Sequence, residues 1–96
     1  MICLAVTFVI APGHEDQATA LLAQLTEATR AEPGCRLYLV HRSTKEPRQF
    51  FVYEQYEDRP AIDAHMASEH FARYLTEGLI PLLESRDLEF YEPLGE

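Results

Sequence analysis

His65 is the side chain in this sequence best suited to acid–base chemistry. It lies in a stretch predicted to be helical, in register with Ile62 and Met66, so we expect its imidazole to face the sheet and not water. A half-buried imidazole with a pKa near neutrality is suited to remove a proton as a general base. The residues alone also fit an imidazole that only hydrogen-bonds a backbone carbonyl or caps the helix end.

Glu54 is the second candidate catalytic residue. It alternates with Val52 on one face of a predicted strand, where a carboxylate among apolar side chains needs a polar partner. One interpretation is that Glu54 orients His65 and stabilises its imidazolium form, as carboxylate partners of catalytic histidines do. The other is a salt bridge across the hairpin to Arg36 or Arg42, or a solvated charge at the strand end.

His70 follows His65 by five residues, a spacing that argues against paired metal ligands. In an unbroken helix this spacing separates two side chains by about 140°, far from the geometry of ligands four residues apart. A break at Ser68 would change that geometry, but we expect no metal site and a His70 that faces solvent or an interface. The sequence has no zinc-type Cys/His spacing and no Gly-rich phosphate loop, so we expect no cofactor.

Aromatic side chains could line a pocket for a flat substrate. The candidate substrate-binding residues are Phe71, Tyr74, Tyr56 and Tyr53, with Tyr38 as a further aromatic neighbour. Phe71 and Tyr74 are the better pocket candidates, because they follow His65 on the stretch expected to cover the sheet. Aromatic residues of a small core are the default explanation for most of this set.

The elements that must position these side chains follow from apolar periodicity and turn residues. Strands are predicted at 2–11, 35–42, 49–56 and 88–91, and helices at 14–31 and from Asp58 onward, renewed from Ser68. This order is the split βαβ, ferredoxin-like pattern of an α+β fold. It predicts one domain over residues 1–96, with a four-stranded antiparallel sheet and both helices on one face.

The first predicted strand is apolar on both faces, which has a consequence for assembly. Two helices can cover only one face of a sheet, so the second apolar face needs another cover. We therefore expect a homodimer joined through the sheet face. The alternative is a monomer with a mildly apolar surface.

Composition excludes several classes of partner. The 96 residues carry 8 Lys+Arg against 16 Asp+Glu, a formal net charge of −8, so nucleic acid and anionic membranes are poor partners. No apolar run approaches the roughly 20 residues of a membrane-spanning helix. Cys3 and Cys35 are expected to be buried thiols, and the first residues lack the pattern of an export signal, which together predict a cytoplasmic location.

Three segments carry a resemblance to a known family. They are EPGC at 32–35, FVYEQY at 51–56 and AHMASEHF at 64–71. In order and spacing they resemble the antibiotic biosynthesis monooxygenase family of dimeric α+β barrel proteins, and the similarity runs from residue 2 to 93. Members of that family include cofactor-independent monooxygenases of quinols and polyketide-derived phenols, an isomerase of a phosphorylated autoinducer sugar, and haem-degrading enzymes.

The haem-degrading branch can be compared residue by residue. That branch typically has an Asn on the first strand, a Trp on the second helix and an iron-binding His about ten residues later. The corresponding positions hold Thr7, His65 and Leu75, and the sequence contains no Trp. Because Leu75 cannot ligate iron, haem degradation is not expected.

The resemblance therefore implies a cofactor-independent monooxygenase that oxidises a quinol or polyhydroxylated aromatic with O₂. His65 would generate the phenolate, with Glu54 behind it, and the substrate itself would reduce oxygen. Two alternatives stay open, namely an isomerase that uses the same general base and a non-catalytic small-molecule-binding module.

Overall fold

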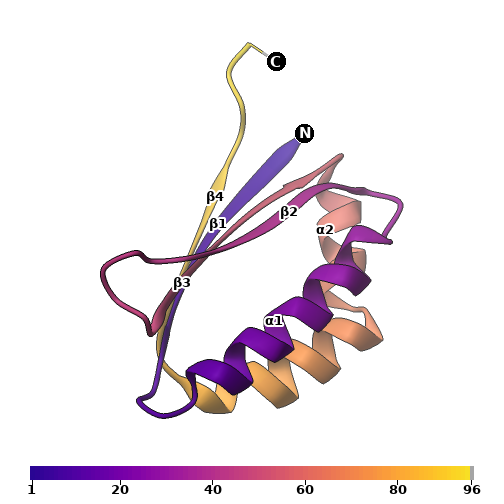
Figure 1. Ribbon diagram of the computed structural model, residues 1–96. Helices are drawn as coiled ribbons and strands as arrows, with labels where there is room; N and C mark the ends of the chain where they lie inside the picture. Colours follow the sequence, from indigo (N-terminus) through magenta and orange to yellow (C-terminus); the bar gives the residue numbers. More distant parts are fainter. Residues whose placement is uncertain (96) are drawn as a thin grey trace.

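Four strands and a layer of helices make up the fold in the computed structural model, which describes residues 1–95 (Figure 1). The elements are β1 (Ile2–Ile10), α1 (Glu15–Arg30), β2 (Cys35–Arg42), β3 (Gln49–Tyr56), α2 (Arg59–Met66), the π-helix η1 (Phe71–Leu79), the 3-10 turn η2 (Ile80–Leu82) and β4 (Leu83–Tyr91). This order confirms the predicted ferredoxin-like α+β fold. Residue 96, the last of the domain expected over residues 1–96, lies outside the described residues.

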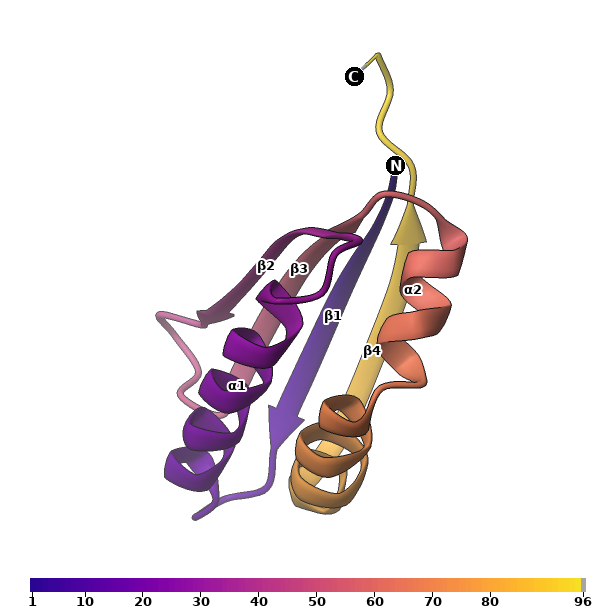
Figure 2. The same cartoon turned by 90° about the vertical axis from the view of Figure 1, so that its right-hand side faces the viewer.

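The sheet is antiparallel with the strand order β2-β3-β1-β4. β1 occupies a central position, and its Val6 lies opposite Val52 of β3 and Leu88 of β4. Figure 2 looks onto the helices, which all lie on one face of the sheet, as the sequence predicted. Within residues 1–95, no helix is both long enough and apolar enough to cross a membrane.

The core lies between the helices and the inner face of the sheet. Alternate residues of β1 point into it, and Leu4, Val6, Phe8 and Ile10 are all buried. From α1, Ala18, Leu22 and Leu25 are buried at the three- and four-residue spacing of one helix face. Both periodicities agree with the sequence prediction.

Local capping determines where α2 begins. Asp58 adopts an extended conformation, and its Oδ1 accepts a hydrogen bond of 3.0 Å from the backbone N–H of Ala61. Pro60 lies in the first turn, where its missing N–H costs nothing. This start sets the rotation of α2, so that Ile62 and His65 are buried while Met66 stays 38% exposed.

A short break separates α2 from η1. α2 ends at Met66, and Ser68 lies in the turn that follows. The Ser68 hydroxyl donates to the carbonyl oxygen of His65 at 2.6 Å and accepts from the backbone N–H of Phe71 at 3.2 Å. The helical path therefore restarts in a new direction, which changes where His70 points.

The last strand differs from its prediction. β4 is hydrogen-bonded to β1 from Leu83 onward, whereas apolar residues marked a strand only over 88–91. The first half of β4 is polar and has no apolar alternation, so its strand character comes from pairing with β1. On the helix-facing side of β4, Leu88 and Phe90 remain 37% and 40% exposed, which leaves this edge of the core open.

The outer face of the sheet has no helix over it. Leu39 lies opposite Tyr53, and His41 lies opposite Phe51, on this face. Leu37, Leu39 and Phe51 are 36%, 41% and 38% exposed. The second apolar face expected from the sequence is therefore present and open in the single chain.

Candidate functional site

His65 occupies the centre of the candidate site. Its residue exposure is 3%, and its ring packs edge-on against Phe71 with the ring centroids 5.2 Å apart. The Tyr56 ring lies on the sheet side of His65, with the two ring centroids 5.3 Å apart. The two ring nitrogens point to different surroundings, and a carboxylate lies on each side.

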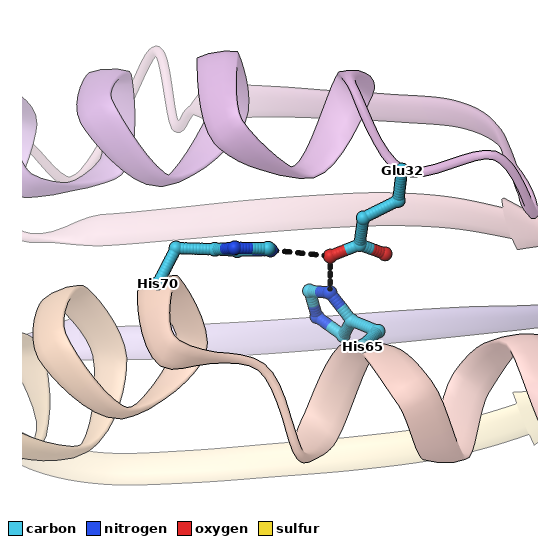
Figure 3. A group of neighbouring side chains, drawn as sticks. All are labelled: Glu32, His65 and His70. Carbon is cyan, nitrogen blue, oxygen red and sulfur yellow. Dashed lines mark hydrogen bonds and ion pairs between the residues drawn. The ribbon is translucent and has the colours of Figure 1, made fainter.

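On the Nδ1 side, Glu32 accepts the hydrogen bond. Its Oε2 lies 2.8 Å from His65 Nδ1, and the same oxygen contacts Nε2 of His70 (Figure 3). Glu32 lies just beyond the end of α1, in the loop that leads to β2. A carboxylate that bridges two imidazoles is held from both sides and cannot rotate freely.

Gly34 lets this loop approach α2 closely. A Cβ atom at position 34 would overlap the Cβ of Ala61, well inside van der Waals contact. Only glycine fits, because the backbone of the loop lies directly against the helix that carries His65. The approach of Glu32 to His65 is thus fixed by backbone packing.

On the Nε2 side, Glu54 lies within ion-pair range. Its Oε1 is 3.9 Å from His65 Nε2 and accepts a hydrogen bond of 2.6 Å from the hydroxyl of Tyr56. Burial raises the pKa of Glu54 from 4.5 to about 7, although the Tyr56 hydrogen bond favours the ionised form. No ion pair among residues 1–95 joins Glu54 to Arg36 or Arg42, so the salt bridge considered from the sequence is not formed.

The hydrogen bond to Glu32 determines the chemistry of the imidazole. Burial lowers the pKa of His65, and the hydrogen bond to Glu32 opposes that effect only in part. The neutral ring is therefore favoured, and an ionised Glu32 accepts only, so the proton belongs on Nδ1. This leaves the lone pair of Nε2 directed toward Glu54 and the pocket beside it.

A small, mainly apolar pocket lies next to Nε2. All four strands, α2 and η1 contribute to its walls, and its acidic or basic members are Glu54, His65 and Arg86. The remaining lining residues are Leu4, Val6, Phe8, Tyr38, Met66, Phe71, Leu75 and Leu88. The free volume inside this partly open pocket is about 30 Å³, which is enough for water but too small for an aromatic ring. A flat aromatic molecule must therefore displace the half-exposed side chains Met66 and Leu88 at the β4 edge.

A family model decides the relationship of this chain to known proteins. The model described as antibiotic biosynthesis monooxygenase matches residues 1–77. The chain belongs to this family. The resemblance inferred from three short segments is thereby confirmed.

Individual proteins are also similar to this chain. Rv0793 of Mycobacterium tuberculosis is 34% identical over 67 residues, which are 70% of this chain and 65% of that protein. Protein sll1783 of Synechocystis is 24% identical over 83 residues, which are 86% of this chain and 56% of that protein. The chain thus spans less than two thirds of the length of either relative. The solved structure of PA3566 from Pseudomonas aeruginosa is 31% identical, with a TM-score of 0.92 over 98% of this chain and 94% of that one.

The structure brings some of the candidate substrate-binding residues to the pocket and not others. Phe71 lines it, and Tyr56 lies behind it through its bond to Glu54. Tyr74 instead lines shallow hollows between α1 and η1. Tyr53 lies on the outer face of the sheet, opposite Ala5 and Leu39, so it is not part of the site.

Sequence reasoning missed Glu32 as a site residue. In the sequence it appeared only as part of the segment that ends the first helix and as the first letter of the EPGC segment. Its contact with His65 spans 33 positions, which no local periodicity reveals. Likewise His70 meets Glu32, and not only solvent or an interface.

Proposed function

We propose that this member of the family is a cofactor-independent monooxygenase that oxidises a quinol or polyhydroxylated aromatic with O₂. One observation carries the proposal. The Nδ1 of His65 is bonded to Glu32, while Nε2 faces an apolar pocket beside Glu54. This is the arrangement of a general base in which a carboxylate on one ring nitrogen fixes the tautomer and leaves the other nitrogen free to accept a proton. Family membership supports a monooxygenase, and the Mycobacterium tuberculosis relative bears a provisional monooxygenase name.

In the proposed reaction, His65 Nε2 takes the phenolic proton and becomes an imidazolium. Glu32 on one side and Glu54 on the other stabilise this positive charge. The phenolate gives one electron to O₂, and the resulting superoxide and phenoxyl radical combine at a ring carbon to form a peroxide. Return of the proton and loss of water yield the quinone, so that one oxygen atom enters the product and the other leaves as water.

The apolar walls contribute to this chemistry in two ways. Side chains such as Phe71 and Leu75 exclude water, which strengthens the attraction between the imidazolium and its carboxylates. They also leave the radical pair few groups with which to react. Proton removal supplies roughly 10²–10⁴-fold of rate enhancement, so the remaining driving force comes from the substrate's own reactivity.

The test is oxygen uptake by EDTA-treated protein with quinols and hydroxylated naphthalenes and anthracenes. We expect uptake above autoxidation that falls at least about tenfold in His65→Ala. His14→Ala, an exposed histidine at the start of α1, is the matched control and should behave as wild type. Uptake no faster than autoxidation would refute the monooxygenase and favour an isomerase or a binding module. Equal turnover in His65→Ala would refute the assignment of the base.

We also propose that two copies associate through the outer face of the sheet. Leu37, Leu39 and Phe51 are more than one third exposed there, and no helix covers them. Burying this face against a second copy would remove the apolar area from water. Sedimentation of a dilute sample should show a dimer that Leu39→Asp dissociates, whereas a wild-type species of 11.0 kDa would refute the proposal.

We place this activity in the cytoplasm. Both cysteines, Cys3 and Cys35, are free thiols, which is typical of proteins in a reducing compartment. Fractionation of the source cells, with the protein detected by antibody, tests this location directly, and recovery outside the cytoplasmic fraction would refute it.

A further inference from the structure

We propose that Glu32, His65 and His70 form a binding site for a divalent cation of the zinc type. The ligand atoms of these three side chains all lie within 4.8 Å of one another. Figure 3 shows the imidazoles of His65 and His70 directed at one carboxylate oxygen of Glu32. Two imidazole nitrogens and one carboxylate oxygen are a common donor set of Zn²⁺ sites in proteins.

The break between α2 and η1 makes this arrangement possible. In an unbroken helix, His65 and His70 would point about 140° apart, the geometry that argued against a metal site in the sequence. The turn at Ser68 redirects the chain, and His70 immediately precedes η1. Both imidazoles therefore reach the same carboxylate, with Gly34 packing the Glu32 loop against α2.

The surroundings of His65 supply a second, independent argument. A metal-bound histidine usually directs its other ring N–H to a carboxylate, a backbone carbonyl or water, which fixes the ring and raises its basicity. When Nδ1 of His65 binds a cation, Nε2 carries the proton and faces Glu54 Oε1 at 3.9 Å. Glu54 is itself fixed by the hydroxyl of Tyr56. The chain thus holds a carboxylate on the outer side of the ring, at ion-pair distance from Nε2 and about 1 Å beyond a hydrogen bond.

The three proposed ligands differ in how far their side chains are exposed to solvent. The side chain of His65 is 4% exposed, that of Glu32 is 14% exposed and that of His70 is 23% exposed. A cation can therefore enter beside His70 and keep a water molecule there as its fourth ligand. Three protein ligands plus water is a coordination that Zn²⁺ adopts readily.

Occupancy of this site would alter the reactivity of His65, a consequence that rests on the proposed function. A cation on Nδ1 moves the ring proton to Nε2, the atom proposed to take the phenolic proton. The loaded protein would then lack its base. The site would make turnover sensitive to free zinc, although the cation lies on the far side of the imidazole from the pocket.

Binding is tested without any reference to turnover. EDTA-treated, dialysed protein is titrated with zinc chloride by calorimetry, and Co²⁺ is used in parallel as a spectroscopic probe. We expect one ion per chain, with visible Co²⁺ bands of a four-coordinate site. His70→Ala should weaken binding by more than the roughly 10–100-fold that loss of an outer-shell partner costs.

Controls separate this site from other zinc ligands. Cys35→Ser removes the thiol of a half-buried cysteine near the loop, and His14→Ala removes an exposed histidine; both should bind as wild type does. Circular dichroism of His70→Ala, with His70→Gln as a second variant, checks that the fold persists. No zinc binding to wild type, or wild-type affinity retained in both His70 variants, would overturn the proposal. Absence of oxygen uptake would overturn the proposed function and leave the binding result intact.

Discussion

The two sides of the His65 imidazole differ in almost every physical respect. On the Nδ1 side, Glu32 comes from a loop, makes a hydrogen bond of 2.8 Å and connects through His70 toward solvent. On the Nε2 side, Glu54 comes from a central strand, lies 3.9 Å away and is buried. Glu32 holds the imidazole through a hydrogen bond, whereas Glu54 lies beside the pocket without one. The difference assigns tautomer control to Glu32 and charge stabilisation to Glu54.

Replacing Glu32 by Gln tests this assignment of roles and should have the largest effect on turnover. The amide can present its N–H to Nδ1 and so move the imidazole proton to Nε2, which removes the base. We expect turnover of the best quinol to fall by about 10²–10⁴. Glu27→Gln, on an exposed position of α1, is the control and should keep full activity. A smaller loss in Glu32→Gln than in Glu54→Gln would reverse the two assignments.

Stability as a function of pH tests the ionisation of Glu54, once the opposite contribution of His65, whose pKa burial lowers, is removed by comparison with Glu54→Gln. The folded state raises the pKa of Glu54 from 4.5 to about 7, so its contribution to stability is fully present below about pH 4.5 and is lost as the pH rises through about 7. This loss amounts to about 3 kcal/mol. In EDTA, urea unfolding of wild type and Glu54→Gln at about pH 5 and about pH 8 should show it as the difference between the two proteins, because the lowered pKa of His65 acts in the opposite direction in both.

Glu54→Gln should lack most of this pH-dependent loss, because a neutral amide has no charged form to bury. Glu57→Gln, on an exposed neighbouring position, should keep the wild-type dependence. If Glu54→Gln followed wild type across this range, the ionisation of Glu54 would not be coupled to folding, and its proximity to His65 would carry no charge effect.

Removal of the Tyr56 hydroxyl tests the Glu54 side of the His65 imidazole further. Tyr56→Phe deletes the 2.6 Å hydrogen bond to Glu54 and leaves a buried carboxylate without its donor. A hydrogen bond to a charged group contributes roughly 1.5–3 kcal/mol, so we expect a loss of about 2 kcal/mol above pH 7. Tyr53→Phe, on the outer face of the same strand, should cost less than about 1 kcal/mol. Equal losses in the two variants would contradict a special role for the buried pair.

The smallest expected effect concerns the turn that positions His70. Ser68→Ala removes the hydroxyl that accepts from the Phe71 N–H, a loss of about 1 kcal/mol in unfolding free energy. The same change should weaken zinc binding, because the turn at Ser68 directs His70 to Glu32. Ser85→Ala, exposed on β4, is the control for both measurements. Unchanged zinc affinity in Ser68→Ala would show that η1 positions His70 without this cap.

Local patterns were sufficient to predict most of the fold. The hairpin strands 35–42 and 49–56 match β2 and β3, because alternating β-rich residues and a polar connection mark them clearly. The polar first half of β4 carried no such pattern and becomes a strand only through pairing with β1. Non-local pairing of this kind cannot be read from one segment.

The site was predictable only where it follows a periodicity. The inward-facing positions of His65 and Glu54 follow from helix and strand periods, and both are buried together. Glu32 lies in a loop without a period, so its meeting with His65 depends on tertiary packing. Tyr53 could have been excluded in advance, because neighbours on a strand point to opposite faces and Glu54 already faces inward.

The contact between Gly34 and Ala61 also limits how this site can change over evolution. Because no space remains for a Cβ at position 34, the two positions cannot vary independently. A larger residue at 34 is compatible with the fold only if position 61 becomes glycine or the loop moves away from α2. Since that loop carries Glu32 and α2 carries His65, substitution at this contact would alter the chemistry of the imidazole without touching any of its polar partners.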